Sequence, residues 1–218
     1  MFYMRNRCGA WQASGDATGG AIEFRLFFPA GFEPGISAIS VAGTFQSQHG
    51  GRDWDFENGQ PLTARVTDDG TFWEAETGEL APNFYEYKYL VTFRDGQSRK
   101  VTDPCTRYGG RDSQNSAIVI GGSQRQDNVP QRLANRKPLR ELTLYELMLD
   151  DFTDEYRGSR APLDAVIDRL DRLVELGFNA ILFMPWTAWK NHDFDWGYEP
   201  FQYFSVEYRY ANDLFQPT

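Results

Sequence analysis

The chain has 218 residues, and its 31 acidic and 22 basic side chains give a net charge of −9. Such a charge repels a phosphate backbone, so we expect no nucleic-acid partner. Hydrophobic residues make up 41% of the chain, enough for a folded core, and no apolar run approaches the roughly 20 residues that cross a bilayer. We therefore expect no membrane partner. Because the first 12 residues are too polar for a secretory signal, we expect a cytoplasmic location.

Aromatic residues are in excess, at 16% of the chain with 6 Trp, which suggests that some of them stack on a flat ligand. The two cysteines, Cys8 and Cys105, could pair, but two in this length form no disulfide framework, and we expect ordinary thiols. With only His49 and His192 and no CxxC or HExxH motif, a histidine-rich metal site is excluded. We expect no cofactor.

Residues 21–121 read as short strands broken by Gly, Asp and Pro. Alternating apolar residues predict strands at 22–28, 36–41, 62–67, 71–77, 84–93, 99–101 and 116–120. In the fifth of these, one face carries Tyr85, Tyr87, Tyr89, Val91 and Phe93. About seven short strands without an intervening helical period indicate an immunoglobulin-like antiparallel β-sandwich.

The residue composition and the hydrophobic pattern of the chain change near residue 125. From residue 121 to 137 the composition turns to Gly, Ser, Gln, Asn, Arg and Pro, which predicts a linker at 126–137 between a sandwich at 1–125 and a second domain at 138–218. There, residues 142–149 form an apolar run typical of a strand buried on both faces. Residues 162–176 have helical spacing between Pro162 and Gly177, and 180–184 form a second buried strand. The order strand, helix, strand predicts a parallel βα unit.

A long aromatic loop follows the second of these buried strands. Residues 178–215 hold 13 of the chain's 34 aromatic residues. Ligands of α/β folds bind at the carboxyl ends of parallel strands, where this loop begins. We therefore look for a ligand site there.

Several stretches of the second domain carry recognisable motifs: YEL at 145–147, DFT at 151–153, LDRLVELGFNAI at 170–181, WGYEP at 196–200 and YFSVEYRY at 203–210. In this order they resemble the α-amylase superfamily of glycoside hydrolases (family 13), most closely its isoamylase, pullulanase and branching-enzyme branch. The preceding sandwich, with GTF at 43–45 and YEYKY at 85–89, resembles the family-48-type carbohydrate-binding module of that branch. The resemblance implies an immunoglobulin-like β-sandwich followed by the first part of a (β/α)8 TIM barrel.

The resemblance also implies what the parent protein does. It would cleave or transfer α-glucans such as glycogen, starch or maltooligosaccharides with retention, through a carboxylate nucleophile and a carboxylic acid. In the family these groups follow later barrel strands, so the chain looks like the N-terminal part of an enzyme that lacks catalytic residues and is inactive alone. The alternative is a non-catalytic α-glucan-binding or scaffold protein. Hydrolysis and branch transfer are not distinguished.

Four side chains are candidates for sugar binding. By resemblance, Tyr198 stacks on the sugar beside the scissile bond and Trp196 lines the same pocket, although loop aromatics can also simply fill a barrel mouth. In the sandwich, the candidates are Trp54, in a polar loop, and Lys88, which matches the module's lysine. The module usually has a second aromatic where this chain has Arg99 and Lys100. Two interpretations of the sandwich therefore stay open: it binds glucan, or it merely supports the barrel. Trp73 should lie in the sandwich core, and Trp186 and Trp189 should pack under the loop.

Two sets of residues could suggest catalysis or metal binding, but for both a simple structural role is the better interpretation. Asp150 and Asp151 end the first buried strand, but neighbouring strand residues point to opposite faces and cannot flank one glycosidic bond. His192, Asp193 and Asp195 could hold a metal ion, yet such residues in a polar turn are usually just solvated. We assign no catalytic residue and no metal site.

Overall fold

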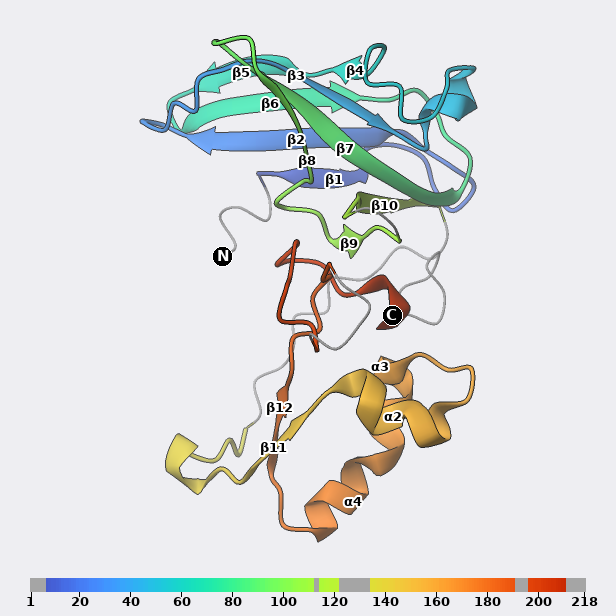
Figure 1. The fold of residues 1–218 in the computed structure, drawn as a ribbon, viewed down its shortest axis with the longest axis vertical. Coiled ribbons are helices and arrows are strands. Elements are labelled where there is room, and N and C mark those ends of the chain that lie inside the picture. The colour runs from blue at the N-terminus through green and yellow to red at the C-terminus, as the bar shows by residue number, and fades with distance from the viewer. Residues whose placement is uncertain (1–6, 112–113, 122–133, 191–195, 211–218) are drawn as a thin grey trace.

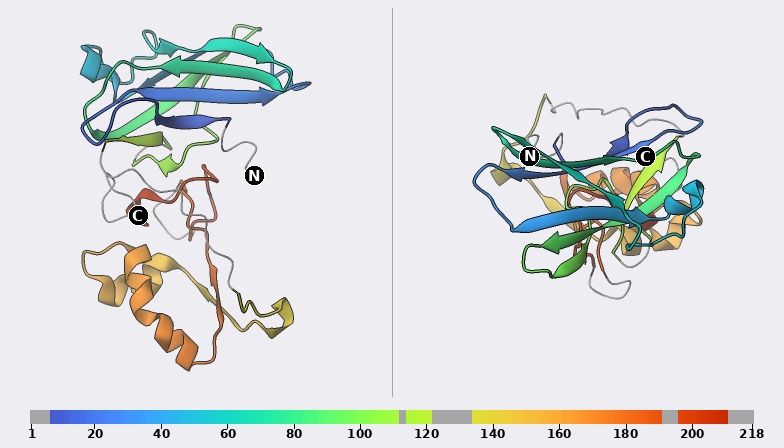
Figure 2. Two further views of the ribbon diagram at one scale, coloured as in Figure 1. Left: turned by 180° about the vertical axis from the view of Figure 1, so that it is seen from behind. Right: turned by 90° about the horizontal axis from the view of Figure 1, so that it is seen from above.

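The structure is a computed structural model that describes residues 7–111, 114–121, 134–190 and 196–210. The N-terminal part is a β-sandwich, and a small unit of two parallel strands and short helices lies at the other end of the molecule (Figure 1). Residues 186–190 and 196–210, called the aromatic segment below, lie between these two parts in both side views (Figures 1 and 2). The aromatic segment therefore contacts structure on both sides.

The first sheet of the sandwich has four antiparallel strands in the order β1-β2-β6-β5. Their bounds are β1 Gly9–Gln12, β2 Ile22–Pro29, β5 Thr63–Thr67 and β6 Gly70–Glu76. The turn between β5 and β6 contains the predicted Asp-Asp-Gly, and Gly70 has φ 147°, a conformation that side chains disfavour.

The second sheet follows the order β4-β3-β7-β10-β9, and β8 also pairs with β7. Its strands are β3 Ile36–Gly43, β4 Gln60–Pro61, β7 Asn83–Phe93, β8 Ser98–Val101, β9 Tyr108–Gly109 and β10 Ser116–Ile120. The short 3-10 helix η1, Gln46–His49, follows β3. Strands β4 and β9 thus form opposite edges of this sheet.

The sandwich core is built by the alternation that the sequence predicts. Tyr85, Tyr87 and Tyr89 of β7 are 0–1% exposed and pack with apolar residues of both sheets. Trp73 lies against this core and is partly buried. Strand β5 is the exception, because it is a sheet edge and Val66 on it is 79% exposed. Period-2 alternation therefore predicts the central strands well and this edge strand poorly.

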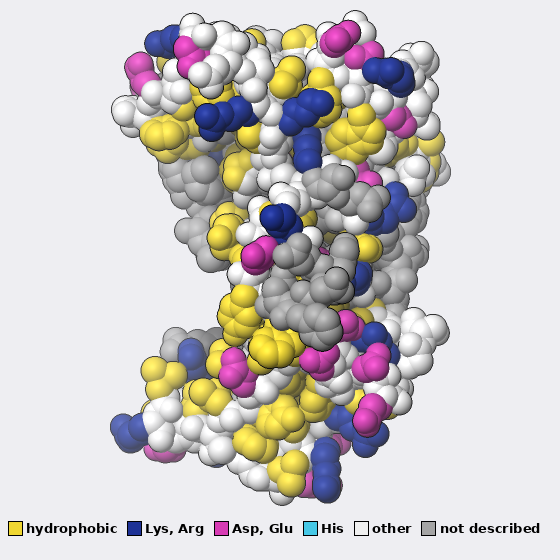
Figure 3. Space-filling model, viewed as in Figure 1, with side chains coloured by type: hydrophobic (Ala, Val, Ile, Leu, Met, Phe, Trp, Pro, Cys, Tyr) yellow, Lys and Arg dark blue, Asp and Glu magenta, His cyan; other side chains and the backbone are white. Residues whose placement is uncertain are grey.

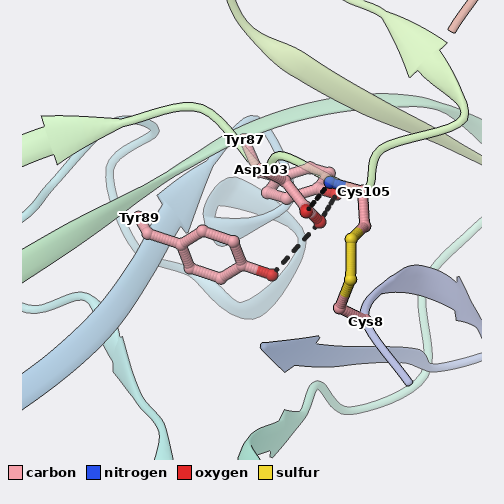
Figure 4. Close-up of a disulfide and its surroundings, with 5 residues drawn as sticks. All are labelled: Cys8, Tyr87, Tyr89, Asp103 and Cys105. Carbon is pink, nitrogen blue, oxygen red and sulfur yellow. Dashed lines mark hydrogen bonds between the residues drawn. A yellow bond between two sulfur atoms is a disulfide. The ribbon is translucent and has the colours of Figure 1, made fainter. Parts of the chain in front are cut away.

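The expectation of two free thiols is wrong, because Cys8 and Cys105 form a disulfide (Figure 4). Their Cα atoms are 5.6 Å apart although 97 positions separate them in the sequence. Both are buried and pack with Phe27 and Phe72. The bond ties the start of the edge strand β1 to the turn after Asp103, which local sequence patterns cannot reveal.

The second part of the chain contains the predicted parallel pair. Strands β11, Leu144–Leu147, and β12, Ala180–Phe183, pair in parallel. The connection holds α2 Leu149–Arg157, α3 Pro162–Ala165, the 3-10 turn η3 Val166–Arg169 and α4 Leu170–Glu175, while short 3-10 turns lie at Leu139–Glu141 (η2) and Tyr208–Tyr210 (η4). The strand expected at 142–149 is shorter and turns into helix α2, so Asp150 and Asp151 lie in the first helical turn rather than at a strand end.

Strands β11 and β12 were expected to be buried on both faces, and in this chain they are not. Leu144 is 52% and Leu182 is 49% exposed. Figure 3 shows hydrophobic side chains gathered on this part of the surface. Two strands with one helical connection leave both sheet edges and much of their apolar surface uncovered. None of the helices in the described ranges is long and apolar enough to cross a membrane.

Candidate functional site

The loop that carries Trp54 is held in place by the side chain of Gln46. Its Oε1 accepts hydrogen bonds from Gly43 N at 3.2 Å and Asp55 N at 3.1 Å, and its Nε2 donates to Asp55 O at 2.9 Å. The Asp55 carboxylate accepts hydrogen bonds from Asn58 Nδ2, Asn58 N and Glu57 N. The bond from the Asn58 side chain contributes most to lowering the pKa of Asp55, and the two backbone bonds add to it. The loop is therefore ordered before any ligand binds.

Within this loop, Trp54 and Phe56 place two rings near each other. Their ring centroids are 6.4 Å apart at an interplanar angle of 33°. Trp54 is half-buried and has φ 61°, an uncommon backbone conformation for a large side chain. Backbone outliers of this kind concentrate at functional sites. The ring pair offers an apolar surface to a ligand.

One lysine contacts this ring pair, and a second lies on the outer face of the neighbouring strand β7. Lys100 of β8 places its Nζ 4.1 Å from the centre of the Phe56 ring, a cation–π contact. Lys88 and Leu90 lie on the outer face of β7, and Lys100 pairs with Leu90 across the strands. Burial, and secondly the Lys100 ammonium, hold the pKa of Lys88 below its ordinary value. Lys100 therefore contacts the Phe56 ring, and its charge acts on Lys88.

This cluster, Trp54, Phe56, Lys88 and Lys100, has the chemistry that a sugar ring requires. A pyranose offers a C–H face to aromatic rings, and its hydroxyls accept hydrogen bonds from ammonium groups. Sequence reasoning named Trp54 and Lys88 but missed Phe56, and it treated Lys100 only as the replacement of an aromatic. The spacing of Trp54 and Phe56 at i and i+2 was a signal that could have found the second ring.

The aromatic segment places its candidate residues at the surface. Tyr198 is 58% and Trp196 is 49% exposed. Trp196 has φ 50° and Gly197 has φ 86°, and a Cβ on Gly197 would lie 2.2 Å from the carbonyl oxygen of Pro185. Only glycine allows this turn to lie against the end of β12. The turn therefore fixes the backbone beside Tyr198.

The neighbouring tryptophans differ in burial. Trp189 is 5% exposed and packs on Tyr210 with ring centroids 5.5 Å apart, so its predicted packing role is confirmed. Trp186 contacts Phe183 but is 44% exposed. The prediction that Trp186 packs beneath the loop is therefore wrong.

The acidic groups do not assemble into a site within the described residues. Asp150 forms an ion pair with Arg157, and both Asp150 and Asp151 lie in the first turn of α2. In the described ranges, no three His, Cys, Asp or Glu side chains are placed to hold a metal ion. His192, Asp193 and Asp195 lie outside the described residues.

The Trp54 loop and the aromatic segment meet opposite edges of the second sheet. The Trp54 loop connects β3 to the edge strand β4, whereas the edge strand β9 meets the aromatic segment through a bridge between Tyr108 and Val206. One ligand molecule bound at both places would therefore have to extend across the sheet.

No known family model matches the chain. It is 26% identical over 187 residues to the 1,4-alpha-glucan branching enzyme GlgB of Halothermothrix orenii, covering 82% of this chain and 27% of that enzyme. It is also 27% identical to GlgB of Bacillus caldolyticus, over 88% of this chain and 28% of that one. A malto-oligosyltrehalose trehalohydrolase of Saccharolobus solfataricus is 28% identical over 57% of this chain and 20% of its own length.

Its homologues are α-glucan branching enzymes and a trehalohydrolase. The chain spans about a quarter of the length of the relatives it matches. Among solved structures, a multi-modular glycogen-degrading pneumococcal virulence factor, SpuA, aligns with all of this chain and 26% of its own at a TM-score of 0.64 and 17% identity. At that identity the likeness concerns the fold.

Proposed function

We propose that the chain is the N-terminal part of a longer α-glucan-active glycoside hydrolase or transglycosidase of the α-amylase superfamily. In this proposal the sandwich, residues 1–125, is a glucan-binding accessory module, 126–137 a linker, and 138–218 the start of the (β/α)8 barrel. The similarity to branching enzymes over 82% of the chain supports it. The uncovered apolar surface of β11 and β12 also fits strands that further barrel strands and helices would cover.

The proposed ligand is an α-glucan such as glycogen, starch or a maltooligosaccharide. The observation that carries glucan binding by the sandwich is the pairing of Trp54 with Phe56 beside Lys100, whose Nζ lies 4.1 Å from the Phe56 ring. By analogy with the family, Tyr198 and Trp196 would contact the sugar beside the scissile bond.

Replacing Trp54 by alanine should weaken binding of maltoheptaose by about 1 to 3 kcal/mol, the usual contribution of an aromatic platform that stacks on a flat ligand. Isothermal titration of the full chain measures this. Phe32→Ala is the matched control, since Phe32 is an exposed sandwich aromatic outside the Trp54 loop. Trp54→Phe should recover part of the affinity. Equal binding by Trp54→Ala and the parent chain would reject the assignment.

Retention requires two carboxyl groups about 5 to 5.5 Å apart across the scissile bond. Asp150 is ion-paired with Arg157 and shares the first turn of α2 with Asp151, and by analogy with the family the catalytic carboxylates follow later barrel strands. We therefore expect the 218-residue chain to release no reducing sugar from glycogen or pullulan above a blank. Enzyme-dependent release that persists after repurification, and that Asp150→Asn and Asp151→Asn do not change, would show that catalytic groups lie elsewhere in the chain.

The cytoplasmic location stays a prediction. The Cys8–Cys105 disulfide weighs against it, because disulfides persist mainly in oxidising compartments.

A further inference from the structure

The aromatic segment meets the sandwich at a closely fitted contact. A parallel bridge joins Tyr108 of β9 to Val206. Next to it, a Cβ on Gly109 would lie 2.6 Å from the Ala188 Cβ, so only glycine allows this approach. Gly109 and Ala188 are both buried. The two surfaces therefore fit each other in shape at this point.

Gln202 lies at the centre of this contact. Its side chain was not among the candidates that the sequence indicates. It is 2% exposed. Its Nε2 donates to Asn115 O at 3.0 Å and to Ser116 Oγ at 3.2 Å, and its Oε1 accepts from Ser205 Oγ at 2.7 Å. Both N–H groups and the carbonyl are thus paired, which burial of an amide demands.

The same hydrogen bonds continue into the sandwich. Ser116 Oγ accepts from Asp103 N at 2.7 Å, and both Ser116 and Asp103 are fully buried. One chain of polar contacts therefore runs from the sandwich core to the aromatic segment. Losing the Gln202 amide would remove both hydrogen bonds that cross from the aromatic segment to the sandwich, and the buried Ser205 hydroxyl would lose the acceptor of its 2.7 Å bond.

Gln202 lies four positions after Tyr198, in a segment whose two arms are paired. Phe201 N donates to Ala188 O at 3.0 Å, Lys190 N to Glu199 O at 3.1 Å, and Ala188 N to Ser205 O at 3.1 Å. At the other end, Gly197 rests against Pro185. The backbone of Tyr198 is thus held between the end of β12 on one side and Gln202 on the other.

We propose that Gln202 is a positioning residue that anchors the aromatic segment to the sandwich and thereby sets the place of the Tyr198 ring. The sandwich would then contribute to sugar binding at Tyr198 through this amide, apart from any glucan that it binds at Trp54. This inference rests on the proposed role of Tyr198. The anchoring itself does not depend on that role and can be tested without a ligand.

The first test is hydrogen exchange of the full chain carrying Gln202→Met, which keeps the length and packing of the side chain and removes its amide. We expect the amides of Ala188, Phe201 and Glu207 to exchange at least about tenfold faster, while those of β7 stay protected. Gln60→Met, at the exposed opposite edge of the sheet, is the control. Unchanged exchange in the aromatic segment would overturn the proposal.

The second test measures maltoheptaose affinity in a Trp54→Ala background, by saturation-transfer NMR, so that sandwich binding does not mask the segment. Gln202→Met should weaken binding about as much as Tyr198→Ala, and the double variant should be no weaker than Tyr198→Ala alone. Equal losses from Gln202→Met with and without Tyr198 would overturn positioning. Absence of binding by the Trp54→Ala chain would contradict the proposed sugar role of Tyr198, and the exchange result alone would then decide the anchoring.

Discussion

Reducing the Cys8–Cys105 disulfide should lower the free energy of unfolding of the sandwich by about 4 kcal/mol. The bond closes a loop over 97 positions, and a cross-link of about that span restricts the unfolded chain by roughly 4 to 5 kcal/mol. Urea unfolding of the full chain with and without reductant, followed by the sandwich signal, measures the difference.

The double variant Cys8→Ala/Cys105→Ala is the control, because its stability should not respond to reductant. Strand β1 should lose protection first on reduction, since it is a four-residue edge strand that the bond ties to the rest of the sandwich. Hydrogen exchange at Trp11 and Ala13, whose amides face β2 in this register, reports this. A reductant effect below about 1 kcal/mol would contradict this prediction. It would mean that residual structure restricts the unfolded chain about as much as the bond does.

The second large effect expected is a fall in sandwich stability as the pH rises from about 4 to 6. Its source is Asp103, whose carboxylate accepts from Tyr87 Oη at 2.7 Å, Tyr89 Oη at 3.4 Å and Cys105 N at 2.8 Å (Figure 4). These bonds favour the ionised form, but complete burial outweighs them and raises the pKa of Asp103 from 3.8 to about 6.

The sign follows from proton binding. Between pH 4 and 6 the folded state holds the Asp103 proton and the unfolded state does not, so this contribution to stability is complete below the unfolded pKa and is lost as the pH passes the folded pKa. A shift of this size corresponds to about 3 kcal/mol. Compared with Asp103→Asn, the parent chain should lose about that much between pH 4 and 7.

Urea unfolding of the parent chain and Asp103→Asn at pH 4 and pH 7 tests this, because the contributions of other carboxylates cancel in the difference. Asp68→Asn, in the exposed turn between β5 and β6, is the matched control. A difference between the parent chain and Asp103→Asn that does not change with pH would mean that Asp103 stays ionised in the folded state throughout this range.

Much of the sandwich was predictable because its central strands carry a period of two. The tyrosines of β7 fill the core as predicted, and the helical stretch from Pro162 to Glu175 lies within the predicted range. The apolar run at 142–149 was ambiguous, since continuous hydrophobicity does not separate a strand from a helix, and its last residue begins α2. The disulfide joins residues that are adjacent only in the folded chain.

The candidate sites were predictable to a similar degree. Trp54 was conspicuous as an aromatic in a polar loop, and Lys88 by its motif. Phe56 and Lys100 meet only because the loop lies near β8. Gln202 is an ordinary polar residue among aromatics, and nothing in its neighbourhood along the chain indicates that Asn115 and Ser116 are its partners.

The fit of Gly109 against Ala188 limits how this sandwich could be exchanged for another binding module in protein engineering. A transplanted module with any side chain at the position of Gly109 would push the aromatic segment away from the sheet edge, because a Cβ there comes within 2.6 Å of Ala188. It would also need a backbone carbonyl and a hydroxyl where Asn115 and Ser116 receive Gln202. A chimera that retains the turn and strands from Asp103 to Ser116 would meet both requirements, and the sugar specificity of the donor loops could then be changed independently of the edge that carries the aromatic segment.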